Sequence, residues 1–272
     1  MKLHQDVQFK TQAKNNEWEQ LKQFTDARIA LGRAGGSLPT RPALAFQLAH
    51  AQAKDAVLKV LDLDGIQAQL AVLQHEVLRI ESCAVDKAQY LQRPDWGREL
   101  SESSRQQLKD YVRQHKEAYD VVIVAGDGLS ARAIEDNAPY FIQQLYEACI
   151  AQGWRVAPLI LATGSRVALG DEAAQILQAK MLVMLIGERP GLSSPDSMGI
   201  YYTWQAHAGC SDAMRNCISN VRPAGLSIQV ALQRLIALMK KSAELGLSGV
   251  QLKDEHEMAA ATDQLQRPKQ LF

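Results

Sequence analysis

Residues 126–131 read Gly-Asp-Gly-Leu-Ser-Ala and fit the G-x-G-x-x-G/A spacing that cradles the phosphates of a dinucleotide. They follow an apolar segment, residues 121–125, that favours a strand. A dinucleotide site also needs an acidic residue after the second strand to bind ribose, whereas residues 161–164 read Leu-Ala-Thr-Gly. We therefore expect a tight strand-to-helix turn with Asp127 or Ser130 as the helix cap. A nucleotide-dependent oxidoreductase using Gly126 to Ala131 is the alternative function.

A second group of residues has the chemistry of a metal site. His207, Cys210 and Cys217, together with Asp212, carry side chains that bind zinc. Their H-x-x-C-x6-C spacing differs from the compact zinc patterns, so we predict no metal site and interpret the cysteines as packing or site-lining residues. No Ser, His or Cys pattern indicates a nucleophilic triad, because the partners of a triad are distant in the chain. We therefore assign no catalytic residue to this chain.

Polar segments follow several of the expected strands. They are residues 126–130, 163–167, 187–192 and 215–220. In a parallel sheet such loops meet at the carboxyl edge, where they would form a crevice with backbone donors, a carboxylate and guanidinium groups. The alternative is four ordinary solvated loops, as in a protein that serves only as an assembly scaffold.

The elements that position these loops alternate between strands and helices. Apolar runs predict strands at residues 121–125, 156–162, 181–186 and 200–204, and helical spacing predicts helices at residues 99–119, 131–152, 171–179 and 227–243. We therefore predict an α/β fold for residues 106–250, a Rossmann-like, doubly wound, mostly parallel sheet. It follows a helical and irregular N-terminal region, residues 1–105, with helical segments at residues 16–31, from Thr40 onward and at residues 62–78. A polar tail, residues 251–272, completes the chain.

Composition excludes several function classes. Thirty basic and thirty acidic residues give a formal net charge of zero, which argues against nucleic acid and anionic membranes as partners. No apolar run approaches the roughly 20 residues that cross a bilayer, and residues 1–14 lack a signal-peptide core. Four cysteines without a C-x-x-C pair suit reduced thiols. We expect a cytoplasmic protein.

Seven motifs occur in order along the chain, at residues 28–35, 40–42, 54–58, 90–98, 127–130, 187–192 and 217–220. Together they resemble the small (light) subunit of ethanolamine ammonia-lyase. The resemblance implies an adenosylcobalamin-dependent lyase that converts ethanolamine to acetaldehyde and ammonia. It also implies a hetero-oligomer in which the large subunit holds the substrate and most of the radical chemistry, while the small subunit covers the cobalamin at the interface.

The resemblance further implies that Val167, Glu188 and Cys217 contact cobalamin. A carboxylate such as Glu188 can accept hydrogen bonds from the amides of the corrin rim, and the other two offer small apolar contacts. Enclosure by a second subunit would also keep water away from the radical. Because arginine is common at interfaces, we expect four arginines to contact the large subunit. They are Arg33, Arg41, Arg93 and Arg98, with solvated surface positions as the alternative.

Two departures from related proteins refine these expectations. Enzymes that replace the cofactor's own base with histidine present D-x-H-x-x-G, whereas residues 254–259 read Asp-Glu-His-Glu-Met-Ala and lack the glycine. We therefore expect the benzimidazole base to stay on cobalt. Some family members carry a longer amphipathic leader that directs them to a bacterial microcompartment, while only 27 residues precede Arg28. The microcompartment stays an open alternative to the cytoplasm.

Overall fold

The computed structural model describes residues 17–253 of the chain. The chain divides into two compact units between Gln52 and Ala53. Within the described residues, no helix is both long and apolar enough to cross a membrane. The histidine-containing fragment at residues 254–259 lies outside the described part.

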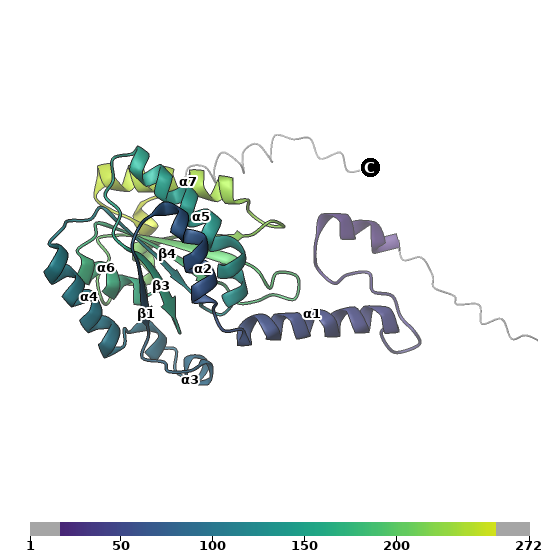
Figure 1. Ribbon diagram of the computed structural model, residues 1–272. Helices are drawn as coiled ribbons and strands as arrows, with labels where there is room; N and C mark the ends of the chain where they lie inside the picture. Colours follow the sequence, from purple (N-terminus) through teal and green to yellow (C-terminus); the bar gives the residue numbers. More distant parts are fainter. Residues whose placement is uncertain (1–16, 254–272) are drawn as a thin grey trace, which may run out of the picture. The chain divides into compact units, whose positions relative to one another are not determined.

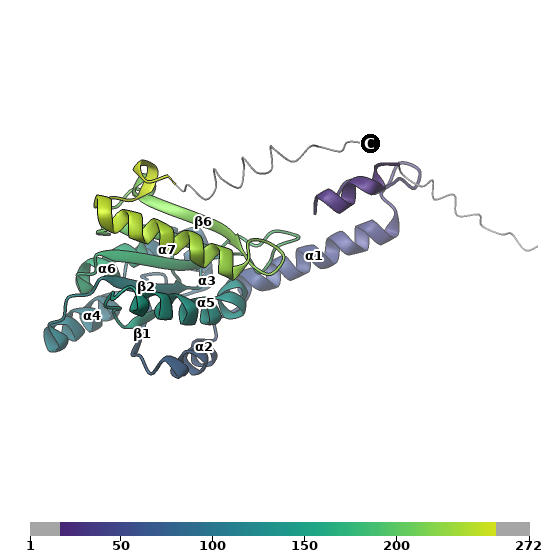
Figure 2. The same cartoon turned by 90° about the horizontal axis from the view of Figure 1, so that it is seen from above.

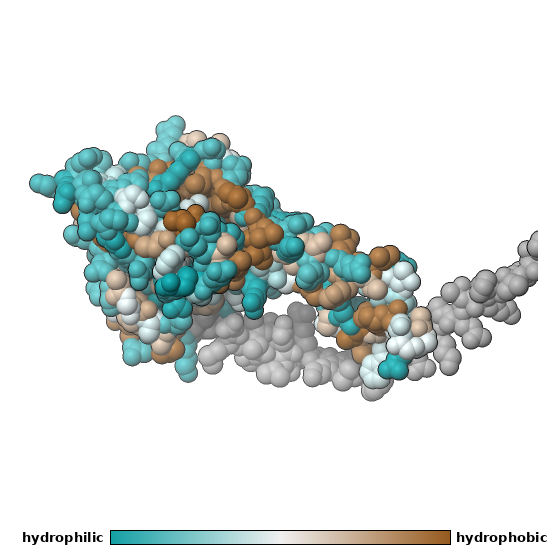
Figure 3. All heavy atoms as spheres, turned by 90° about the horizontal axis from the view of Figure 1, so that it is seen from below, coloured by the Kyte–Doolittle hydropathy of each residue, from teal (hydrophilic) through white to brown (hydrophobic). Residues whose placement is uncertain are grey.

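The first unit contains helices and turns. A 3-10 helix, η1 (Glu17–Phe24), occupies part of the segment predicted as one helix, and α1 (Thr40–Leu58) begins at the predicted position and extends across the boundary between the units. The guanidinium of Arg28 lies 6.0 Å from the centre of the Phe46 ring. Many large apolar side chains of this unit are exposed, including Trp18, Phe24 and Leu48. In Figure 3, brown hydrophobic residues lie at the surface among teal hydrophilic ones.

The second unit is built on a six-stranded mixed sheet with the strand order β1-β3-β2-β4-β5-β6. The first four strands in this order are parallel, while β5 is antiparallel to β4 and β6 is antiparallel to β5. The strands are β1 (Val77–Glu81), β2 (Val121–Gly126), β3 (Leu159–Thr163), β4 (Met181–Gly187), β5 (Met198–Trp204) and β6 (Arg215–Val221). The α/β class and the mostly parallel sheet are as predicted.

Helices cover the sheet on two sides, as Figures 1 and 2 show. The helices of this unit are α2 (Leu63–Leu70), α3 (Lys87–Gln92), α4 (Glu102–His115), α5 (Ala131–Ala151), α6 (Leu169–Leu177) and α7 (Ile228–Leu245). Side chains of α2, α5 and α7 form one buried cluster with the sheet, and those of α4 and α6 form the other. Four short 3-10 helices complete the unit: η2 (Ala71–Leu73), η3 (Trp96–Arg98), η4 (Asp212–Met214) and η5 (Gly249–Gln251).

Local sequence signals explain where these helices begin and end. Asp62, Ser101, Ser130 and Ser227 each accept a hydrogen bond from a backbone N–H of the first turn, of α2, α4, α5 and α7 respectively. Such caps satisfy donors that have no partner within the helix. At the other end of α7, Gly246 adopts a φ of 70°, a left-handed conformation that glycine tolerates well.

Two strands differ from the prediction. β1 lies in the region expected to be helical or irregular, and residues 215–220, expected to be a loop, form most of β6. Both are edge strands of the sheet. An edge strand with one exposed face needs few apolar residues, so the exposed Arg79 and Glu81 in β1 and the exposed Ser219 in β6 obscured the strand pattern. The prediction of a fourth polar loop was therefore wrong.

Candidate functional site

Three of the predicted polar loops meet at one edge of the sheet. They follow the carboxyl ends of β2, β3 and β4, which are neighbours in the order β3-β2-β4. The loop after β2 touches the end of β4, because the N–H of Leu129 donates to the carbonyl of Gly187 at 2.9 Å. A Cβ on Gly128 would lie 2.3 Å from the same carbonyl, so this close approach requires glycine. The convergence expected from a parallel sheet is present for these three loops.

The glycine-rich turn is occupied by contacts within the protein. The N–H groups of Asp127, Leu129 and Ser130 donate to carbonyls of this chain, and Ser130 caps α5. The Asp127 carboxylate accepts hydrogen bonds from the backbone N–H groups of Gly164 and Ser165 at 3.0 and 2.9 Å. Because these donors have internal partners, the turn offers a poor phosphate cradle, which argues against the alternative function as an oxidoreductase.

Glu188 follows β4 directly and joins three strands at this edge. Its carboxylate accepts a hydrogen bond from the hydroxyl of Ser197, just before β5, and another from the backbone N–H of Asn220 in β6 at 3.3 Å. Its backbone N–H donates to the carbonyl of Ser197 at 3.0 Å. A Cβ on Gly199 would lie 2.9 Å from the Oε1 atom of Glu188, so a small residue is needed there. The carboxylate is half-buried and held from two sides.

Cys217 lies in β6 opposite Tyr201 of β5, and its side chain is exposed. Local packing raises the pKa of the Cys217 thiol above its ordinary value; a hydrogen bond from the Tyr201 hydroxyl opposes this shift, and the charge of Glu188 adds to it. Burial raises the pKa of Tyr201, and the Cys217 thiol and the Glu188 charge act in the same direction. The Glu188 charge therefore acts on both the Tyr201 hydroxyl and the Cys217 thiol, which also act on each other.

Val167 lies between β3 and α6, in the loop at the carboxyl edge. Its half-buried side chain packs against the cluster formed with α4 and α6, as does that of Tyr201. Successive residues of a strand point to opposite faces, so Cys217, paired with Tyr201, points to this same side of the sheet. The three residues predicted to contact a cofactor thus share one side of the molecule, with Val167 and Glu188 at its edge.

A buried ion pair that the sequence analysis missed fixes β6 to α6. The guanidinium of Arg215, the first residue of β6, donates through Nη1 and Nη2 to the two carboxylate oxygens of Asp171, with an Nη2–Oδ2 distance of 2.7 Å. The side chains are 2% and 1% exposed. A third partner, the carbonyl of Cys210, accepts from Arg215 at 2.9 Å. The sequence gives no signal for this pair, because its members lie 44 positions apart.

The other predicted site residues are separated. His207 Nδ1 lies 3.4 Å from the Cys210 Sγ atom, whereas Cys217 is exposed in β6 and Asp212 pairs with Arg215. Over residues 17–253, no three His, Cys, Asp or Glu side chains are placed to hold a metal ion.

The four arginines expected at an interface are all exposed: Arg33, Arg41, Arg93 and Arg98. One of them has an internal partner, because Arg93 pairs with Asp95 at 2.5 Å and lies over the ring of Trp96.

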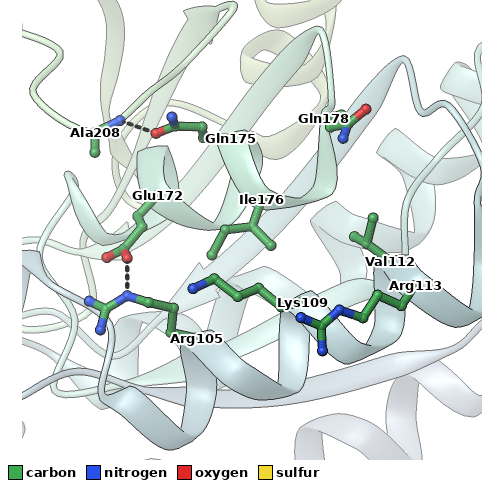
Figure 4. A pocket seen from close by; sticks show the side chains of 9 residues that line it. All are labelled: Arg105, Lys109, Val112, Arg113, Glu172, Gln175, Ile176, Gln178 and Ala208. Carbon is green, nitrogen blue, oxygen red and sulfur yellow. Dashed lines mark hydrogen bonds and ion pairs between the residues drawn. The ribbon is translucent and has the colours of Figure 1, made fainter.

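A shallow depression of about 480 Å³ lies between α4 and α6 (Figure 4). Its lining includes Arg105, Lys109, Arg113 and Ile176, and Arg105 pairs there with Glu172 at 2.5 Å. None of Val167, Glu188 and Cys217 lines it. The depression is therefore a feature of the helical surface and contains none of the three residues predicted to contact a cofactor.

Known proteins of one family match this chain over most of its length. A family model described as "Ethanolamine ammonia-lyase light chain" matches residues 15–253. Proteins named "Ethanolamine ammonia-lyase small subunit" are similar to it in Pseudomonas fluorescens, with 53% identity over 88% of each chain, and in Pseudomonas aeruginosa, with 50% identity over 90% of each chain. The protein of that name from Ralstonia nicotianae is 51% identical over 89% of this chain and 90% of its own. This chain belongs to the ethanolamine ammonia-lyase light-chain family.

Proposed function

We propose that this chain is the small subunit of an adenosylcobalamin-dependent ethanolamine ammonia-lyase. With a large subunit it converts ethanolamine to acetaldehyde and ammonia. The family match and the small subunits among its relatives support this function, and the name of those relatives implies a larger partner. The radical chemistry comes from homolysis of the cobalt–carbon bond in the bound cofactor. This chain contributes enclosure and positioning.

The observation that carries the cofactor role is the grouping of Glu188 with Tyr201 and Cys217 on the exposed side of β5 and β6. Apart from the Arg215–Asp171 pair at the start of β6, the helices that pack against these two strands are α5 and α7, which belong to the opposite side of the sheet. Cys217 and Ser219 are left exposed. A broad surface with a half-buried carboxylate at its edge suits a large, amide-bearing macrocycle. The residues present therefore fit a corrin.

Each proposed contact has a distinct chemical role. Glu188 accepts hydrogen bonds from amide N–H groups, and its bonds from Ser197 and Asn220 hold the carboxylate in place. Val167 and Cys217 supply apolar contact, because the raised pKa keeps the thiol neutral near pH 7. The large subunit closes the other side and excludes water from the radical.

The finer structural assignments follow the same proposal. We assign the second unit to a Rossmann-like, doubly wound class, with residues 106–250 as the cobalamin-covering region. Residues 1–105, with Arg33, Arg41, Arg93 and Arg98, serve contacts to the large subunit. The complex belongs to the cytoplasm, with a microcompartment as the alternative. Its cofactor keeps the benzimidazole base on cobalt, and electron paramagnetic resonance coupling from a histidine nitrogen would refute this last assignment.

The decisive experiment uses the complex of this chain with its large subunit. In the Glu188→Gln complex, we expect cobalamin to bind about ten- to a hundredfold more weakly, the cost of one charge-assisted hydrogen bond. Binding is measured by visible absorption of cobalamin that stays with the protein after gel filtration. The thermal unfolding temperature should change little, because glutamine retains an acceptor for Ser197 or Asn220.

Glu117→Gln is the matched control, because Glu117 is exposed and precedes β2 at the opposite edge of the sheet. This variant should bind cobalamin like the wild type. Equal cobalamin affinity in the two variants would remove Glu188 from the site. A wild-type complex that releases no ammonia from ethanolamine in the presence of adenosylcobalamin would overturn the function itself.

A further inference from the structure

Two cations lie against one buried tyrosine beside the carboxyl edge. Lys87 opens α3, and its Nζ atom lies 4.7 Å from the centre of the Tyr90 ring. The guanidinium carbon of Arg166, from the loop after β3, lies 4.3 Å from the same centre. Tyr90 is 1% exposed. Cation–π contacts of this kind hold both charges in place.

The position of Arg166 is fixed by further packing. Its backbone N–H donates to the carbonyl of Gly97 at 2.7 Å, and a Cβ on Gly97 would lie 2.9 Å from the Arg166 side chain. The Nη2 atom donates weakly to the carbonyl of Tyr90 at 3.4 Å. The Nε atom is buried and has no hydrogen-bond partner among the described residues. Arg166 is half-buried, and a buried Nε donor without a partner indicates that this corner suits a further acceptor.

The charges in this corner do not balance. Asp127 is the carboxylate nearest to Lys87, at 3.9 Å, and it already accepts bonds from the backbone of Gly164 and Ser165. Lys87 Nζ donates instead to the carbonyl of Gly128 at 2.9 Å. Burial lowers the pKa of Lys87, and the charge of Arg166 lowers it further, against the opposing effect of Asp127. Two cations face one carboxylate, which leaves one positive charge in excess.

This corner borders the proposed cobalamin surface. Arg166 directly precedes Val167 in the chain. Lys87 contacts the loop of Gly128, which in turn contacts Gly187, the residue before Glu188. The Lys87 side chain is 21% exposed, so a ligand can reach its ammonium group. A single ligand on the carboxyl edge can therefore contact Lys87 and Arg166 as well as Val167 and Glu188.

We propose that Lys87 and Arg166 bind one phosphate group, the phosphodiester in the nucleotide loop of cobalamin. This inference rests on the proposed function, since it names which part of the cofactor these residues recognise. Arginine and lysine are the side chains that bind phosphate most effectively, arginine through its planar fork and lysine as a point charge. A phosphodiester carries one negative charge and so matches the single excess charge of the corner. Free phosphate shares this chemistry and is the other source.

Cobinamide distinguishes these possibilities, because it keeps the corrin ring and lacks the phosphate, ribose and base. In the complex with the large subunit, Lys87→Met should weaken cobalamin binding about ten- to a hundredfold and leave cobinamide binding unchanged. Arg166→Lys keeps the positive charge and loses the planar guanidinium. It should also weaken the binding of cobalamin and not of cobinamide, by a smaller factor than Lys87→Met. Affinities are measured by visible absorption titration, and thermal unfolding verifies that each variant folds.

Lys116→Met is the matched control. Lys116 is exposed at the end of α4, so this substitution removes the same charge at a distant position. It should leave both affinities unchanged. Equal losses of cobalamin and cobinamide in Lys87→Met would overturn the phosphate contact while leaving the cobalamin surface intact. Calorimetry with inorganic phosphate tests whether free phosphate is the natural ligand. If phosphate binds to the wild-type complex equally well with and without cobalamin, the inference is overturned. A wild-type complex that binds neither corrinoid would overturn the proposed function together with it.

Discussion

The two halves of the sheet are covered differently. In the parallel half, helices pack on both sides, and every residue of β2 and β4 is buried. In the antiparallel half, α5 and α7 pack against β5 and β6 on one side, while Cys217 and Ser219 of β6 are exposed on the other. The parallel half is thus complete within this chain, whereas the antiparallel half has a surface available to a ligand or partner.

This difference separates stability from function. A strand buried on both sides contributes apolar area and leaves no room for a ligand. A strand covered on one side keeps its buried residues, here Ile218 and Val221, for the core and frees the alternate positions. Glu188 lies where the two halves meet, between β4 and β5, so it can join the rigid part to the open surface. We expect substitutions in the two halves to produce different phenotypes.

The largest effect should come from the ion pair that joins α6 to β6. Asp171→Ala leaves the Arg215 guanidinium buried without its charged partner, so we expect a loss of about 3–5 kcal/mol in the free energy of unfolding. Chemical denaturation of the full chain measures this loss. Asp212→Ala is the control, because Asp212 also pairs with Arg215 and its side chain is 98% exposed.

The control should change the free energy of unfolding by less than about 1 kcal/mol, as expected for an exposed partner. If the two variants were equally stable, the buried pair would not fix the open half of the sheet to α6, and the division between the two halves would need another cause.

A smaller loss should follow from a cavity in the covered half. Leu185 of β4 is fully buried, so Leu185→Ala should lower the free energy of unfolding by about 2–5 kcal/mol. Cys217→Ala in the open half removes an exposed side chain and should change it by no more than about 0.5 kcal/mol. Thermal and chemical unfolding of the two variants compare the halves directly. A similar loss in both would mean that the surface around Cys217 is already packed within this chain.

The four inner strands β2, β3, β4 and β5 could be predicted from the sequence, whereas the two edge strands β1 and β6 could not. The continuous apolar runs that become β2 and β4 indicate burial on both sides, and their ends located the loops with Asp127 and Glu188. The edge strands β1 and β6 have mixed sequences, because one exposed side accepts polar residues, and no local pattern separates them from loops. The antiparallel direction of β5 depends on pairing between strands, which periodicity does not encode.

The site was predictable in part for the same reason. Glu188 and Val167 follow recognisable strands, so their common edge follows from a parallel sheet. The contact of Cys217 with Tyr201 required the register of β5 and β6, and the Arg215–Asp171 pair required the fold itself. Lys87 and Tyr90 lie on a six-residue helix too short to give a periodic signal, so their approach to Arg166 could be found only in three dimensions.

The smallest predicted effect concerns the reactivity of the Cys217 thiol, which reports on the open surface. Because its pKa is raised, alkylation by iodoacetamide should be slow near pH 7 and increase as the pH rises and the thiolate forms.

Glu188→Gln removes a charge that raises this pKa and should speed alkylation, whereas Tyr201→Phe removes a hydrogen bond that lowers it and should slow alkylation. Each change should be less than about tenfold, because the packing around the thiol contributes more to its raised pKa than either neighbour does. Mass spectrometry of the labelled full chain follows Cys217, with buried Cys149 as the unlabelled internal reference. Changes of the same sign in both variants would show that access and not the charge of Glu188 governs this thiol, and the electrostatic link between β4 and β6 would then be absent.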